Sequence, residues 1–148
     1  MSAKTDTVRH QYLHQKVLTA SREKLLLLTF EIAIDTCSKA EETIRISDFQ
    51  GANEALKTAQ QAIRELQFAL RPDKAEELAD NLNRLYDFMR QELIEANVKK
   101  DAEKIANVRS MLEDLAGAWR EAVEAAAQEH PNSSAGREMI GGALDISY

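Results

Sequence analysis

The sequence predicts an all-α fold: an antiparallel up-down four-helix bundle with an N-terminal arm or short helix. Only five Gly and two Pro occur among the 148 residues, so the chain has few of the residues that form the turns of β-sheets. Hydrophobic residues make up 44% of the chain and charged residues 30%, a balance typical of amphipathic helices. The length is sufficient for one domain with its own hydrophobic core.

The first helix is expected from about Ser21 to Ile44, with Ser21 as its N-cap and Glu23 near the positive end of the helix dipole. Apolar residues at spacings of three and four predict one buried stripe, which consists of Leu26, Phe30, Ala33, Ile34, Cys37, Ala40 and Ile44. A second apolar strip lies beside it and consists of Leu25, Leu28 and Ile32. This helix is therefore apolar over more than one face.

The second helix is expected from about Phe49 to Leu70, after a cap at Ser47-Asp48. Its buried stripe is rich in alanine and consists of Ala52, Ala55, Leu56, Ala59, Ala62, Ile63, Leu66, Ala69 and Leu70. Small side chains let a neighbouring helix approach closely. Pro72 then interrupts the chain, and Asp73 with Glu76 three residues later has the spacing of a capping box.

The third helix is expected from about Lys74 to Ala96, and Asn97 is expected to end it in the left-handed conformation. Its stripe consists of Ala75, Leu78, Ala79, Leu82, Leu85, Tyr86, Met89, Leu93 and Ala96. The fourth helix is expected from about Ala102 to Ala127, with Asp101 as its N-cap. Gly117 lies inside this helix, where glycine is unfavourable, so we expect it to mark a close contact with another helix.

Four helices of similar length joined by short connections favour antiparallel neighbours, and hence the up-down topology. The expected organisation is an N-terminal arm over residues 1–20, the four-helix bundle over 21–127 and a flexible tail over 128–148. The arm carries scattered apolar residues, among them Tyr12.

Several classes of protein are excluded by composition. The longest apolar run is the four residues Leu25–Leu28, far below the roughly 20 residues of a membrane span, so no stable membrane binding is expected. The N-terminus lacks an apolar secretory signal and the chain has one cysteine, which together favour a cytoplasmic location. With 19 basic and 25 acidic residues the formal net charge is −6, which argues against nucleic acid as a partner.

Enzyme and cofactor signatures are also missing from the sequence. No Glu-x-x-His pair, Gly-rich phosphate loop, G-x-S-x-G or H-E-x-x-H occurs, so no enzyme activity, cofactor or metal site is expected. His10 and His14 have i,i+4 spacing in the arm, but no carboxylate or cysteine clusters with them. Cys37 falls on the buried stripe of the first helix, which favours a core thiol over a nucleophile.

The class of function that remains is binding to another protein through the shape of an apolar surface. The second apolar strip of the first helix, with Phe68 and Phe88 off the main stripes, gives the chain more apolar surface than four buried stripes use. Three interpretations stay open: a groove for an amphipathic helix of another chain, a homodimer interface, and coverage by the N-terminal arm. The three can coexist, because a partner can displace an arm that covers a groove.

The sequence between Tyr12 and Ala122 resembles the FliS family of flagellin export chaperones. The matching pieces are Tyr12 with Val17-Leu18-Thr19-Ala20-Ser21 and Lys24-Leu25, Lys57-x-Ala59-Gln60-x-x-Ile63-x-Glu65-Leu66, Ala79-x-Asn81-Leu82-x-x-Leu85-Tyr86-Asp87-Phe88-Met89, Leu93-x-x-Ala96-Asn97 with Asp101, and Val108 through Leu112 to Ala118-Trp119. Their order and spacing carry the resemblance, and the family fold agrees with the predicted bundle. One departure is Ile32, which stands where the family often has glycine and adds bulk to that face.

The resemblance implies a cytoplasmic chaperone that binds the disordered, amphipathic C-terminal segment of flagellin, prevents premature polymerisation and assists flagellar type III export. Export gate components are further implied partners. The alternative is a self-associating helical bundle or a chaperone for another secreted helical protein. The expected groove and arm residues are Tyr12, Leu25, Leu28, Ile32, Leu56, Ile63, Leu66 and Tyr86. Tyr12 is expected to dock on the apolar surface of the free bundle and to move when flagellin binds.

Overall fold

The computed structural model describes residues 21–71, 73 and 75–129, and this part of the chain forms the predicted all-α four-helix bundle. The helices are α2 (Arg22–Arg45), α3 (Phe49–Phe68), α4 (Glu76–Lys99) and α5 (Ala102–Glu129). The expected arm over residues 1–20, with Tyr12, His10 and His14, lies outside the described residues, as does the tail from residue 130 onward.

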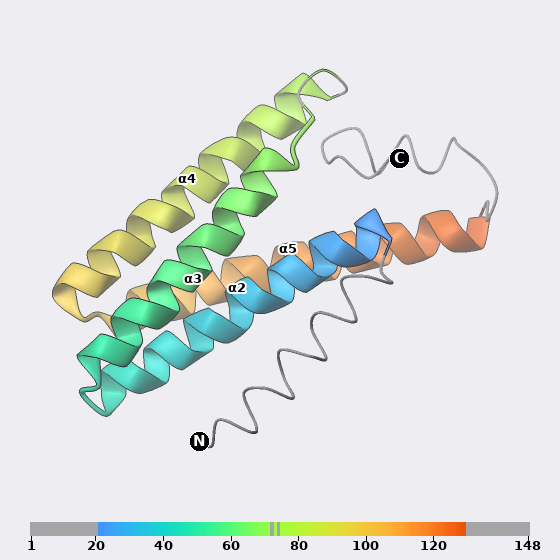
Figure 1. Ribbon diagram of the computed structural model, residues 1–148. Coiled ribbons are helices and arrows are strands. Elements are labelled where there is room, and N and C mark those ends of the chain that lie inside the picture. The colour runs from blue at the N-terminus through green and yellow to red at the C-terminus, as the bar shows by residue number, and fades with distance from the viewer. Residues whose placement is uncertain (1–20, 72, 74, 130–148) are drawn as a thin grey trace.

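The four helices form a closed ring of neighbours. α2 packs against α3 and α5, and α4 packs against the same two helices from the other side. The α2–α3 and α4–α5 loops lie at the same end of the bundle (Figure 1). From that end the α2/α5 pair and the α3/α4 pair run at an angle to each other. The helices are therefore closest near the two loops and more widely spaced at the opposite end.

The α2–α3 interface is the most extensive of the four. α3 contributes small buried side chains to this packing, and Ala52 and Ala59 have no exposed surface. Alanine leaves little bulk between two helix axes, so α2 and α3 can approach closely. The alanine stripe recognised in the sequence accounts for this tight interface.

Three of the predicted helix caps are confirmed. Ser21 Oγ accepts a hydrogen bond from a backbone N–H of α2 at 3.4 Å, and Asp48 Oδ1 accepts one from α3 at 2.9 Å. Asp101 Oδ1 accepts two such bonds from α5 at 3.1 and 3.3 Å. These oxygens satisfy N–H groups that have no partner inside their own helix.

Two predicted helix ends are wrong. α4 begins at Glu76 with Ala75 as N-cap and no side-chain cap, so Asp73 does not cap it; two glutamates in the first turn complement the helix dipole instead. α4 also continues past Asn97 to Lys99, and Lys100 takes the left-handed conformation. The Asn97 side chain donates to Asn53 Oδ1 of α3 at 2.9 Å, which stabilises a helical position for this residue.

The core is one contiguous cluster of buried side chains from all four helices. Its largest fully buried members are Tyr86, Phe30, Leu56, Ile63, Leu66, Met89, Leu93, Ile105, Leu112, Val108 and Cys37. Glu41 of α2 is also buried, and its carboxylate accepts hydrogen bonds from Arg109 Nε at 2.6 Å and Arg109 Nη2 at 3.3 Å. This paired contact satisfies the buried charge and joins α2 to α5 near the loop end.

The expected close helix contact at Gly117 is wrong. A Cβ atom at this position would meet nothing within 4 Å in the described part of the chain. Gly51 differs, because a Cβ there would collide with the Asp48 carboxylate that caps α3. Gly117 and Gly51 are therefore an open and a crowded position at which the effects of the same glycine-to-alanine substitution can be compared.

We expect Gly117→Ala to raise the free energy of unfolding by about 0.5–1 kcal/mol, because alanine loses less backbone entropy than glycine in a helix. Gly51→Ala should lower it, because the new methyl group displaces the capping carboxylate. Urea denaturation followed by circular dichroism measures both changes. A loss of stability in Gly117→Ala would contradict the open surroundings of this residue.

Candidate protein-binding surfaces

Four of the predicted site residues are core residues. Leu56, Ile63 and Leu66 of α3 have no exposed surface, and Tyr86 of α4 is 1% exposed. Burial raises the pKa of the Tyr86 phenol above its usual range. In this structure these side chains offer no surface to a partner, which would reach them only if the helices moved apart.

The other predicted groove residues lie on α2, where Leu25 and Ile32 are half-buried. Leu28 is the unexpected member, because it is two residues before the core residue Phe30 and therefore roughly 200° around the helix from it. A side chain pointing that far from the core should be exposed, yet Leu28 is only 4% exposed and is not part of the core cluster. Leu28 is therefore buried at a position that the core stripe of α2 does not account for.

A second apolar surface lies between α4 and α5, and an ion pair fixes which faces meet there. Lys104 Nζ of α5 lies 3.0 Å from Glu92 Oε2 of α4. Residues seven positions apart share one face of a helix, so Leu85 faces α5 like Glu92, and Met111 faces α4 like Lys104. Because the two helices are antiparallel, Leu85 and Met111 come opposite each other one heptad from the ion pair.

The side chains of this surface are only partly covered. Leu82, Leu85, Met111 and Leu115 pack against the core but are not fully buried, and Leu78, one heptad before Leu85, is 51% exposed. The interface between α4 and α5 is the smallest of the four. We name Leu78, Leu82, Leu85, Met111 and Leu115 the α4–α5 strip.

The α4–α5 strip consists of partly exposed apolar side chains on two neighbouring helices that separate toward the end where Leu78 lies. Phe88 borders it with 47% of its surface exposed. An apolar strip of this kind accepts the apolar face of an amphipathic helix. Sequence reasoning assigned Leu78, Leu82 and Leu85 to the buried stripe, because periodicity identifies an apolar face without showing how closely a neighbour covers it.

Side chains suited to chemistry are absent or inactive in the described residues. Cys37 has no exposed surface, and burial, with a smaller contribution from nearby Glu41, raises the pKa of its thiol to about 12. The thiolate form that reacts as a nucleophile is therefore disfavoured. Among residues 21–71, 73 and 75–129, no group of three or more His, Cys, Asp or Glu side chains is placed to hold a metal ion. None of the described helices combines the length and apolar character needed to cross a membrane.

We expect the raised thiol pKa to make stability fall with pH between about 9 and about 12. In this window the unfolded thiol loses its proton while the folded thiol keeps it, so the unfolded state is favoured as pH rises. The loss from this group approaches about 1.4 kcal/mol per pH unit. Urea denaturation at several pH values should show a shallower decline for Cys37→Ala, in which Tyr86 still titrates. Equal slopes in the two proteins would contradict this assignment.

Comparisons with known proteins give one family. The model of the family described as flagellar protein FliS matches residues 5–126. The chain is 30% identical over 122 residues to the flagellar secretion chaperone FliS of Bacillus subtilis (strain 168), covering 82% of this chain and 90% of the relative. It is 33% identical over 106 residues to the flagellar secretion chaperone FliS of Salmonella typhimurium, covering 71% and 78%.

A comparison with solved structures also finds a flagellar chaperone. The crystal structure of a flagellar chaperone from bacteria superposes with a TM-score of 0.65 at 25% sequence identity. The match covers 81% of this chain and 98% of that one. About four fifths of this chain is therefore similar in fold to nearly the whole of a crystal structure of a flagellar chaperone.

Proposed function

The chain belongs to the FliS family of flagellar chaperones, and from this premise we propose that it binds the C-terminal segment of flagellin in the cytoplasm. The family consists of chaperones, so the expectation that the chain is not an enzyme is confirmed. The bound segment would be kept from polymerising and held ready for the flagellar type III export gate.

The observation that carries this proposal is the α4–α5 strip. Its apolar side chains are partly exposed to water, at a free-energy cost of about 25 cal/mol for each Å² of apolar surface. An amphipathic flagellin helix laid on the strip would remove this surface from water. The client must become ordered as it binds, which offsets part of the gain and leaves a complex that can be released at the export gate.

The burial of Leu28 supports a second part of the proposal, which concerns the N-terminal arm. Residues 1–20, with Tyr12, would cover the α2 surface formed by Leu25, Leu28 and Ile32 in the free chaperone. The client would bind the uncovered α4–α5 strip first and then replace the arm on α2. Two apolar surfaces on different helices suit a long client segment that wraps around the bundle.

Calorimetric titration of the full chain with a peptide from the flagellin C-terminus tests the proposal. We expect binding with a negative heat-capacity change, the mark of buried apolar surface. Leu78→Ser and Phe88→Ser should each weaken binding about tenfold, or about 1.4 kcal/mol, without unfolding a bundle in which both side chains are exposed.

Phe68→Ser is the matched control, because Phe68 is 79% exposed on α3 and lies outside the strip. Its affinity should equal that of the unaltered chain. Absence of binding by the unaltered chain would remove the flagellin assignment and leave a self-associating bundle or a chaperone for another helical protein. Equal losses in all three variants would remove the strip as the binding site.

Deletion of residues 1–20 tests the arm. An arm that competes with the client lowers the fraction of chaperone able to bind, so its removal should tighten the apparent affinity for the same peptide. Circular dichroism confirms that the shortened chain keeps its helices. Unchanged or weaker affinity would show that the arm does not compete with flagellin.

A further inference from the structure

The two helices that form the α4–α5 strip carry an excess of acidic residues. α4 and α5 each have six acidic and three basic residues, whereas α2 and α3 together have seven acidic and six basic residues. The negative charge of the bundle is therefore concentrated around the strip. We propose, on the premise that this strip is the client-binding site, that its client is an amphipathic helix whose apolar face is bordered by lysine or arginine.

The excess charge lies along one edge of the strip, on α5. Asp114 is three residues after Met111, and Glu121 is seven residues after Asp114, so both acidic residues lie beside the apolar residues that α5 contributes. Both side chains are exposed. Among residues 21–71, 73 and 75–129, neither carboxylate has an ion pair or a hydrogen-bond partner. We name Asp114 and Glu121 the acidic border.

The basic residues of α5 do not neutralise the acidic border. Lys104 Nζ lies 3.0 Å from Glu92 Oε2 of α4, so its charge is already paired. Arg109 Nε lies 2.6 Å from Glu41 Oε2 of α2, on the other side of the helix. Arg120 is eleven residues, or about three turns, after Arg109 and therefore shares the side that faces α2. All three basic side chains of α5 are thus directed away from the acidic border or held by α4.

The edge of the strip on α4 has no excess of positive charge either. Glu77 and Arg84 are both exposed and one heptad apart, so their formal charges cancel along this edge. Lys99 is the last residue of α4, at the end of the bundle away from Leu78, where Glu103 of α5 is also exposed. A client helix on the strip would therefore meet unpaired carboxylates on its α5 side.

The acidic border favours a different protein over a second copy of the chain. In a two-fold dimer the same surface of both subunits forms the interface. Asp114 and Glu121 of both copies would then lie in one contact, where like charges oppose association. A helix with basic residues beside its apolar face would instead form ion pairs with these carboxylates. Opposite charge of this kind also speeds the encounter of two proteins.

Titration calorimetry of the full chain with two designed helical peptides tests the proposal. Both peptides carry the same leucine face, which is bordered by lysines in one peptide and by glutamates in the other. We expect the lysine peptide to bind at least tenfold more tightly, and added salt to reduce this difference. Asp114→Asn combined with Glu121→Gln should weaken binding of the lysine peptide about fivefold, because each exposed ion pair contributes modestly.

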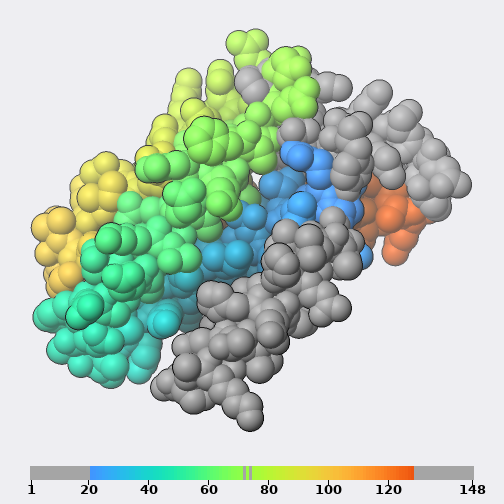
Figure 2. Space-filling view, in the orientation of Figure 1, coloured from blue at the N-terminus to red at the C-terminus, as the bar shows by residue number. Residues whose placement is uncertain are grey.

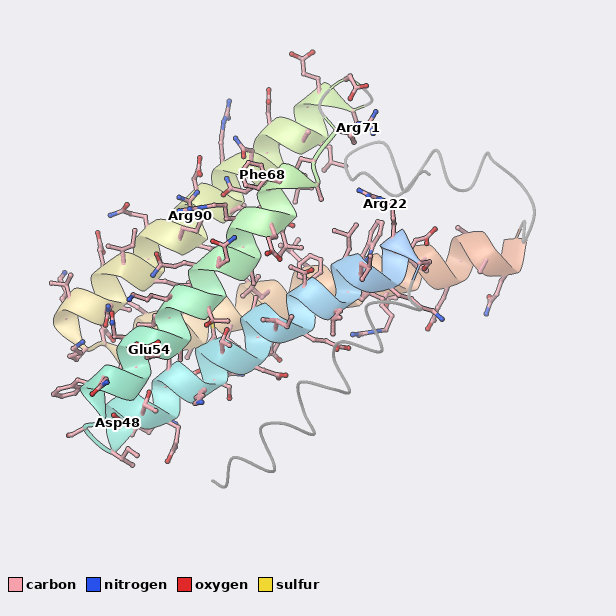
Figure 3. All side chains as sticks on the ribbon, viewed as in Figure 1. Arg22, Asp48, Glu54, Phe68, Arg71 and Arg90 are labelled. Atoms are coloured by element: carbon pink, nitrogen blue, oxygen red, sulfur yellow. The ribbon has the colours of Figure 1, made fainter. Side chains whose placement is uncertain are left out.

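Glu54→Gln combined with Glu65→Gln is the matched control, because it removes two exposed carboxylates from α3 and leaves the strip intact. Figure 3 labels Glu54 on α3. Figure 2 shows α3 on a face of the molecule where α5 is visible mainly at its C-terminal end. The control should bind the lysine peptide as the unaltered chain does. Circular dichroism confirms that both double variants keep their helices.

Several results would overturn the proposal. These are absence of binding by both designed peptides, equal affinities for the two peptides, or equal losses in the two double variants. A dimer of the free chain that Leu78→Ser dissociates would assign the strip to a second copy.

The flagellin C-terminal peptide, titrated in the same way, separates the charge of the client from its identity. Flagellin binding without a preference between the designed peptides would overturn the role of the acidic border alone. A preference for the lysine peptide without flagellin binding would support the acidic border and remove the flagellin assignment.

Discussion

The close packing of α2 on α3 is the constraint on which the other features of the bundle depend. Alanines along α3 bring the two helices together over the most extensive interface in the molecule. α5 and α4 then pack on the outer sides of this pair and share the smallest interface with each other. An uneven bundle of this kind fills its core well and still leaves apolar side chains partly exposed along the α4–α5 seam.

Polar contacts fix the α3/α4 and α2/α5 pairs. On α3, Gln67 Nε2 donates to Asn83 Oδ1 at 2.9 Å and to Asp87 Oδ1 at 2.8 Å, and Gln67 Oε1 accepts from Arg90 Nη1 at 2.7 Å. This network joins α3 to α4, where Figure 3 shows Arg90 beside α3. On the other side, Trp119 Nε1 of α5 donates to the Glu23 carbonyl of α2 at 3.3 Å. Such directional bonds fix helix pairs in one register, whereas apolar packing alone tolerates sliding.

The sequence was sufficient to predict the elements and not the spacing between them. Ser21, Asp48 and Asp101 were recognised as caps because a side-chain oxygen at a helix start acts over two or three residues. Asn97 was assigned the wrong role because its hydrogen bond reaches Asn53, 44 residues away, and no local pattern indicates such a contact. Local chemistry is therefore visible in the sequence, and contacts between helices are not.

The same distinction explains the binding surfaces. Apolar periodicity predicts Leu56, Ile63 and Leu66 as groove walls, and they are core because the surrounding helices leave them no exposed surface. Leu85 has the same periodicity and stays partly exposed. Leu78 lies near the start of α4, at the end of the bundle where the helices are more widely spaced, and is 51% exposed. Apolar periodicity does not show how the distance between two helices changes along their length, and this distance decides which apolar residues are covered.

The most direct measurement of the central claim is methyl cross-saturation in the complex of the full chain with the flagellin C-terminal peptide. The claim is that the uneven bundle leaves the α4–α5 strip available to a client helix. Methyl signals of Leu78, Leu82, Leu85, Met111 and Leu115 should lose intensity when the peptide is irradiated. Loss confined to Ile46 and Val98, or no loss at any methyl of α4 and α5, would contradict the claim.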